Sequence, residues 1–176
     1  MKFILPMATA VTAAALSTMP AAAQQATDNI GVSLTVEASC TIDANDLAFG
    51  ATGGQIAADL PQTTTLSVTC TNGAPFNIGL NDGGTDEPAV TRKMSNVTTP
   101  TAKVNYNLYK EAGHTNVWGN TPGTNTTDGT GTGTAQTFTV YARIPAGQNN
   151  LTVGQYTDTI TATIWYGSQY VAPSGT

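Results

Sequence analysis

The chain has 176 residues, and its 11 acidic residues outnumber its 6 basic residues, which gives a net charge of −5. Charged residues make up 10% of the chain, against about 25% in ordinary soluble domains. This balance provides no basic patch and excludes nucleic-acid binding. A polar but weakly charged surface is typical of an extracellular β-protein.

The N-terminus has the order of regions of a secretory signal peptide. Lys2 supplies a short positive region, Phe3–Leu16 form an apolar region, and Ala21-Ala22-Ala23 is a small-residue cleavage site. The apolar run is too short and too rich in Ala and Thr to span a membrane. We therefore interpret residues 1–23 as a signal peptide rather than an N-terminal core helix, and expect the mature chain to begin at Gln24.

The first segment of the mature chain alternates apolar with small or polar residues. Its apolar positions are Ile30, Val32, Leu34 and Val36, a period of two that predicts a β-strand with one apolar face. No hairpin partner precedes this segment in the mature chain. It must therefore pair either with a distant strand of its own chain or with another molecule.

The chain has two cysteines, Cys40 and Cys70. Export places them in an oxidising compartment, where an even pair predicts one disulfide. Closing that loop contributes about 3–4 kcal/mol by the loop-entropy estimate. A zinc or thiol site is not favoured because His114 is the only histidine. The acidic segment 82–87 gathers three carboxylates without the spacing of an EF-hand, so we expect no metal and no cofactor, with calcium there left open.

The same alternation recurs along the rest of the chain and predicts further strands. A short connection at Asn72-Gly73 joins the first two of them. A short strand is expected around Met94–Val97, and the clearest pattern predicts one strand over Tyr156–Tyr166. The apolar positions that carry the pattern are Leu66, Val68 and Cys70; Phe76, Ile78 and Leu80; Val104, Tyr106 and Leu108; Phe138, Val140 and Ala142; and Ile160, Ala162 and Ile164.

The segments between these strands are rich in Gly, Asn, Asp, Pro and Thr, as turns require. The longest, Gly119–Ala135, has low complexity and is expected to be a mobile surface loop. Several short strands with one disulfide predict an all-β, Ig-like sandwich, with a closed barrel as the alternative.

Catalytic chemistry is scarce in this sequence. No general base, nucleophile and orienting residue can be named together, so we expect the protein not to be an enzyme. Trp118 and Trp165 fit ordinary packing or interface roles better than stacking on sugars.

Several short motifs occur in a fixed order along almost the whole mature chain. In this order and spacing, the chain resembles the spore coat U-type domain, the subunit family of archaic chaperone–usher pili. The tail Gly167–Thr176 extends beyond the place where such subunits usually end. The motifs are the alternating strand into Cys40, Leu47-Ala48-Phe49-Gly50, Leu66-Ser67-Val68-Thr69-Cys70 with Gly73-Ala74-Pro75-Phe76, Arg92-Lys93-Met94, Tyr106-Asn107-Leu108-Tyr109, Val117-Trp118-Gly119, Ala146-Gly147-Gln148, and Gly154-Gln155-Tyr156-Thr157-Asp158-Thr159.

This resemblance implies an incomplete Ig-like sandwich that a donor strand from a neighbouring subunit completes. A periplasmic chaperone fills the open groove first, and the N-terminal extension of the next subunit replaces it at an outer-membrane usher. Carried onto this chain, residues 24–36 are the donor-strand extension and residues 37–176 the pilin domain. The implied donor residues are Ile30, Val32, Leu34 and Val36.

The favoured function is therefore a structural pilus subunit that polymerises with identical or related subunits into a cell-surface fibre. Such a fibre serves adhesion and biofilm formation, and the subunit reaches it by secretion through the periplasm. The alternative is a monomeric secreted β-sandwich module that binds carbohydrate and packs Ile30–Val36 within its own fold.

Overall fold

The computed structural model describes residues 23–84 and 91–173. The chain divides into two units, Met1–Leu34 and Thr35–Thr176. In the described part of the first unit, residues 23–34, the backbone forms no helix or strand. Every strand of the described residues belongs to the second unit. Within residues 23–84 and 91–173, no helix has the length and apolar character needed to cross a membrane.

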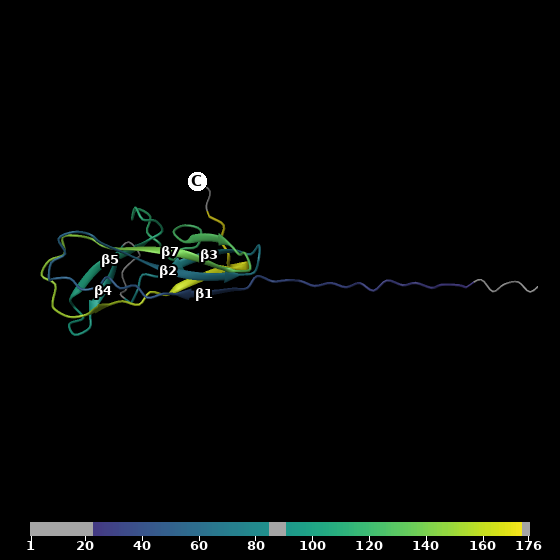
Figure 1. The fold of residues 1–176 in the computed structure, drawn as a ribbon, viewed down its shortest axis with the longest axis horizontal. Helices are drawn as coiled ribbons and strands as arrows, with labels where there is room; N and C mark the ends of the chain where they lie inside the picture. Colours follow the sequence, from purple (N-terminus) through teal and green to yellow (C-terminus); the bar gives the residue numbers. More distant parts are fainter. Residues whose placement is uncertain (1–22, 85–90, 174–176) are drawn as a thin grey trace, which may run out of the picture. The chain divides into compact units, whose positions relative to one another are not determined.

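The larger sheet of the second unit is antiparallel and has six strands, in the order β1-β2-β7-β5-β4-β8. Its longest pairing joins β2 and β7, which lie side by side with Leu66 opposite Phe138 (Figure 1). The strands are β1 (Cys40–Ala44), β2 (Leu60–Cys70), β4 (Arg92–Asn96), β5 (Lys103–Tyr109), β7 (Ala135–Ile144) and β8 (Tyr156–Thr157).

The smaller sheet has three strands in the order β6-β3-β9. These are β6 (Thr127–Thr130), β3 (Pro75–Leu80) and β9 (Ala162–Tyr166), and both pairings are antiparallel. A 3-10 helix, η1 (Gly167–Gln169), follows β9 directly. Since both sheets end in edge strands among the described residues, the molecule is an open sandwich and not the closed barrel that the sequence left as an alternative.

Alternating apolar residues of both sheets meet in one core. The rings of Phe76 in β3 and Phe138 in β7 pack edge to face, with their centroids 5.9 Å apart. Trp118 is almost fully buried, and its indole N–H donates to the Ile78 carbonyl over 2.8 Å. Trp118 therefore has the packing role that the sequence favoured over sugar stacking.

The C-terminal segment packs against the outer face of the smaller sheet. Asn77 in β3 donates to the Val171 carbonyl over 3.0 Å and accepts from the Val171 N–H over 2.9 Å. A side chain at Gly123 would lie 2.9 Å from the Ala172 carbonyl oxygen, so the segment also lies close to the loop before β6. The tail that the sequence marked as unusual is thus part of the folded domain up to this point.

The predicted strands in the middle of the chain are confirmed. The alternations at Val104–Leu108 and Phe138–Ala142 lie in β5 and β7, and the short strand near Met94 is β4. The predicted connection at Asn72-Gly73 is also present, and Gly73 adopts a φ of 80° there. It does not form a hairpin between paired strands, however, because β2 and β3 lie in different sheets.

Two predictions were wrong. Tyr156–Tyr166 is not one strand, because residues 158–161 separate β8 in the larger sheet from β9 in the smaller sheet. Gly119–Ala135 is not simply a surface loop, because it contains β6. The strand escaped notice because T-D-G-T has no apolar residue, and it is held by pairing with β3.

Candidate functional site: an open groove between the sheets

A groove with a volume of about 1080 Å³ opens into the core of the second unit. Leu66 of β2 and Val140 of β7 line it from the larger sheet, while Leu80 of β3 and Ala162 of β9 line it from the smaller sheet. The groove therefore lies between the two layers of the sandwich, where a complete sandwich would be filled by its own side chains.

The lining of this groove is mainly apolar. Fully buried side chains of the core form part of it, and half-buried side chains packed against that core form the rest. Most of the partly buried apolar side chains that pack against the core cluster are gathered here. They are Leu47, Phe49, Leu60, Met94, Leu151, Tyr156, Ile160 and Ala162.

Two mostly irregular segments form walls of the groove, residues 45–54 and residues 151–160, and the second contains the short strand β8. Backbone hydrogen bonds fasten the ends of these segments to each other. The Ile56 N–H donates to the Gln148 carbonyl over 2.9 Å, and the Leu151 N–H donates to the Gly54 carbonyl over 3.2 Å. These bonds join the two segments at one end of the groove.

Unpaired strand edges border the groove. Among the described residues, β1 pairs only with β2, and β9 pairs only with β3. Each of these edge strands contributes a lining residue, Ala44 and Ala162 respectively. An edge strand presents free N–H and C=O groups that can pair with an added strand. The site thus combines apolar pockets with backbone partners for an extended peptide.

One polar pair lies in this apolar lining. The Tyr106 hydroxyl donates to Asp158 over 2.8 Å, and Asp158 also accepts from the Gly84 N–H over 2.8 Å. Burial, together with the hydrogen bond to Asp158, raises the pKa of Tyr106 well above its usual value. Tyr106 therefore stays a neutral hydrogen-bond donor at physiological pH and holds residue 158 against β5.

Arg92 of β4 is fully buried and connects the two sheets next to the groove. It donates to the Leu80 carbonyl over 2.9 Å, to the Asn81 carbonyl over 2.8 Å and to the Trp118 carbonyl over 2.7 Å. A fourth bond, of 2.7 Å, goes to the Asn107 side-chain oxygen. Burial lowers the pKa of the guanidinium. Sequence reasoning noted Arg92 only as part of a motif; its alternation with Met94 and Asn96 was the available signal that it faces inward.

The two cysteines lie where the sequence prediction requires. Cys40, the first residue of β1, is bonded to Cys70, the last residue of β2, and the two residues are direct partners in the strand pairing. The predicted disulfide is confirmed.

The other predicted site residues lie outside every strand of the described chain. Ile30, Val32 and Leu34 are 90%, 91% and 89% exposed, and Val36 is 72% exposed. Their assignment as donor residues stays a prediction.

Metal-binding chemistry is limited. Within residues 23–84 and 91–173, no group of three or more His, Cys, Asp or Glu side chains is placed to hold a metal ion. Part of the acidic segment considered for calcium, residues 85–87, lies outside the described residues.

Comparisons with known proteins agree with the architecture. No curated protein matches the chain. A solved chain from the chaperone–tip adhesion subunit pre-assembly complex, CsuC–CsuE, of the archaic chaperone–usher Csu pili of Acinetobacter baumannii is similar, with a TM-score of 0.52 and 24% identity. The match covers 74% of this chain but only 40% of that one. This likeness confirms the predicted Ig-like fold.

A second solved chain, from a chaperone–tip adhesin complex of CFA/I fimbriae biogenesis, covers 70% of this chain and 38% of its own length, at 14% identity and a TM-score of 0.34. That similarity is too low to bear on the fold. The sequence itself matches the family model of the Spore Coat Protein U domain over residues 26–163. Because this match spans most of the chain, the protein belongs to the Spore Coat Protein U domain family.

Proposed function

We propose that this protein is a structural subunit of a chaperone–usher pilus, which polymerises by donor-strand exchange into a cell-surface fibre for adhesion and biofilm formation. One observation carries the proposal. The domain has an apolar groove bordered by unpaired strand edges, and the same chain carries an exposed segment with the pattern of the missing strand. An open groove and a free strand on every copy suit growth by addition of copies.

The chemistry of the segment suits the chemistry of the groove. Residues 29–36 carry no charged side chain, and their apolar residues stand at alternate positions. A strand of this kind can bury one face in apolar pockets while its backbone pairs with β9 or β1. Full burial of Ile30, Val32, Leu34 and Val36 would contribute about 6–12 kcal/mol, as an upper bound from apolar transfer.

Residues 24–36 are therefore proposed as the donor extension and residues 37–176 as the pilin domain, which acts without catalysis. A signal peptide over residues 1–23 would deliver the chain to the periplasm. There a chaperone would cover the groove until an outer-membrane usher passes the subunit to the fibre. The family membership and the solved chaperone–subunit neighbour support these partners.

The test is to supply the strand within one chain. A chain that lacks residues 24–35 should aggregate, because its groove stays exposed. The same chain with residues 24–36 attached after Thr176 through a flexible Gly/Ser linker should be monomeric and much harder to unfold. The attachment follows Thr176 because Val171 is held by Asn77 and should stay in place. A short linker that reaches gives an effective concentration in the millimolar range.

The matched control carries the same linker and segment with Val32→Asp and Leu34→Asp, since a charge without a partner is costly in an apolar groove. It should behave like the chain without the segment. Unfolding in denaturant and size-exclusion chromatography measure both properties. A truncated chain that is already a stable monomer, and gains nothing from the attached segment, would favour the monomeric carbohydrate-binding module instead.

A further inference from the structure

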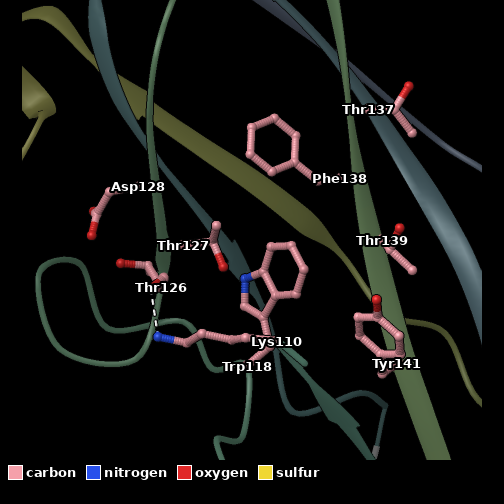
Figure 2. A pocket seen from close by; sticks show the side chains of 9 residues that line it. All are labelled: Lys110, Trp118, Thr126, Thr127, Asp128, Thr137, Phe138, Thr139 and Tyr141. Atoms are coloured by element: carbon pink, nitrogen blue, oxygen red, sulfur yellow. Dashed lines mark hydrogen bonds between the residues drawn. The ribbon is translucent and has the colours of Figure 1, made fainter. Parts of the chain in front are cut away.

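The sandwich has a second opening, at the other edge of the smaller sheet. It is a pocket of about 480 Å³ between β6 and β7, and Figure 2 shows side chains of the two strands on either side with the Trp118 indole between them. The strand β7 pairs with β5 only at Tyr141–Arg143, so on that side its earlier residues have no strand partner among the described residues. The pocket lies beside this unpaired part of β7.

The lining of this pocket differs from that of the groove, because it is rich in hydroxyl groups. Four threonines and a tyrosine stand around the aromatic rings of Phe138 and Trp118. A hydroxyl can both donate and accept a hydrogen bond, so the pocket offers both kinds of partner over a short distance. The hydroxyl-bearing residues are Thr126, Thr127, Thr137, Thr139 and Tyr141.

The charged residues of the lining are balanced and already engaged. Lys110 donates to the Thr126 carbonyl over 2.7 Å, and Asp128 accepts a hydrogen bond from Asn77. Among residues 23–84 and 91–173, they are the only charged residues that line the pocket. A charged ligand would meet both an attractive and a repulsive partner, whereas a neutral ligand meets no mismatch.

One hydroxyl in the lining has no partner. The side-chain oxygen of Thr127 is buried and makes no hydrogen bond to any residue that the structure describes. A buried polar atom without a partner costs free energy, and such an atom calls for a water molecule or a ligand group. In Figure 2 this side chain lies among the pocket residues beside the indole of Trp118.

We propose that this pocket binds a neutral sugar ring, with ring hydroxyls bonded to the threonine hydroxyls and apolar ring C–H groups against Phe138. The volume lies in the range of small-molecule sites. The combination of neutral hydroxyl partners with an aromatic wall suits a hexose better than an anion or a purely apolar molecule. The site is independent of the groove, so it can be present whether or not the chain forms fibres.

The experiment measures saturation-transfer NMR between the full mature protein and four free sugars, namely glucose, galactose, mannose and N-acetylglucosamine. At least one should receive signal from the protein. Thr127→Val and Thr139→Val, which replace a hydroxyl by a methyl of the same size, should each weaken its binding roughly five- to tenfold. Thr130→Val is the matched control, because Thr130 lies on the same strand as Thr127 but outside the pocket, and it should bind as the unchanged protein does.

Three results would overturn the site. They are the absence of transfer to all four sugars, equal binding by the two pocket variants and the unchanged protein, and an equal loss in Thr130→Val. Thermal unfolding of each variant shows that it is folded. If Thr127→Val does not fold, Thr139→Val decides, since Thr139 is only half-buried.

Discussion

Two stretches of this chain have nearly the same pattern and opposite environments. Residues 32–36 read VSLTV and residues 66–70 read LSVTC, so both alternate an apolar residue with Ser or Thr. Leu66 and Val68 are buried, with exposed fractions of 2% and 0%, whereas Val32 and Leu34 are about nine-tenths exposed. The difference lies in the pairing: β1 pairs with residues 66–70 and β7 with residues 66–69, whereas residues 32–36 belong to no strand. A period of two specifies a face, but not the partner that covers it.

The largest effect should come from placing the same charge in both stretches. Val68→Asp puts an unpaired charge into the core and should cost more than about 4 kcal/mol, enough to prevent folding. Leu34→Asp should change the stability of the domain by less than about 0.5 kcal/mol, yet it should abolish fibres. The measurements are soluble yield with a co-expressed periplasmic chaperone and electron microscopy of the cell surface. Failure of Leu34→Asp to fold would mean that residues 30–36 pack within their own domain.

The second prediction concerns Arg92, whose hydrogen bonds connect the two sheets of the domain independently of residues 32–36. Arg92→Met leaves the carbonyl groups of Leu80, Asn81 and Trp118 without their donor, and should cost about 3–5 kcal/mol. Urea unfolding, followed by the fluorescence of the buried Trp118, measures the loss. Lys103→Met is the matched control, because Lys103 lies on the neighbouring strand and is exposed; it should change stability by less than about 0.5 kcal/mol. Equal effects of the two changes would refute the role of Arg92.

The disulfide lies between residues 32–36 and the larger sheet in the chain, because Cys40 is the first residue of β1. Cys40→Ser together with Cys70→Ser should lower the free energy of unfolding by about 3 kcal/mol, and a reductant should do the same to the unchanged protein. Intact mass should correspond to a chain that starts near Gln24 and is lighter than the reduced form by the two hydrogens lost in oxidation. Two thiols that can be alkylated in the native protein would contradict the bond.

The smallest effect is expected at Glu111, in the turn after β5 and remote from both stretches. It accepts hydrogen bonds from the Thr115 hydroxyl over 2.6 Å and the Asn116 N–H over 2.7 Å. The bond from Thr115 is the main cause that lowers the pKa of Glu111 from 4.5 to about 2. Because the pKa is lower in the folded state, this contribution is fully present above about pH 4.5 and is lost as the pH falls through 2.

Glu111→Gln removes this titration, so it should reduce the loss of stability between pH 4.5 and 2 that the unchanged protein shows. Thermal unfolding across that range provides the comparison. Identical pH profiles for the two proteins would show that Glu111 contributes nothing to the turn.

Sequence reasoning found the strands whose alternation is filled by their own core, such as β5 and β7, because burial of one face imposes that pattern. It misjudged residues 158–161, where the chain changes sheets, because alternation does not show which sheet a strand joins. It missed β6. The Phe76 ring lies so close to the backbone of this strand that residue 129 has no room for a side chain, and glycine gives no alternation to detect. Only the partner strand reveals such a segment.

The groove itself could be anticipated only through the family resemblance, since its lining comes from segments far apart in the chain. The buried role of Arg92 was equally hidden, because its partners are mostly backbone carbonyls that no side-chain pattern reveals. Exposure of Ile30–Val36 could not be read from their composition, which is that of a buried strand.

The position of the disulfide has a mechanical consequence. A pull on the residues before Cys40 passes Ser39, whose carbonyl accepts a hydrogen bond from the Thr71 N–H, and meets the bond to Cys70 at the first residue of β1. Tension therefore passes covalently into β2, which is paired along its length with β7, instead of peeling β1 away one hydrogen bond at a time. The Cys40–Cys70 bond thus protects β1, the first strand to carry the force, from being pulled off the sheet.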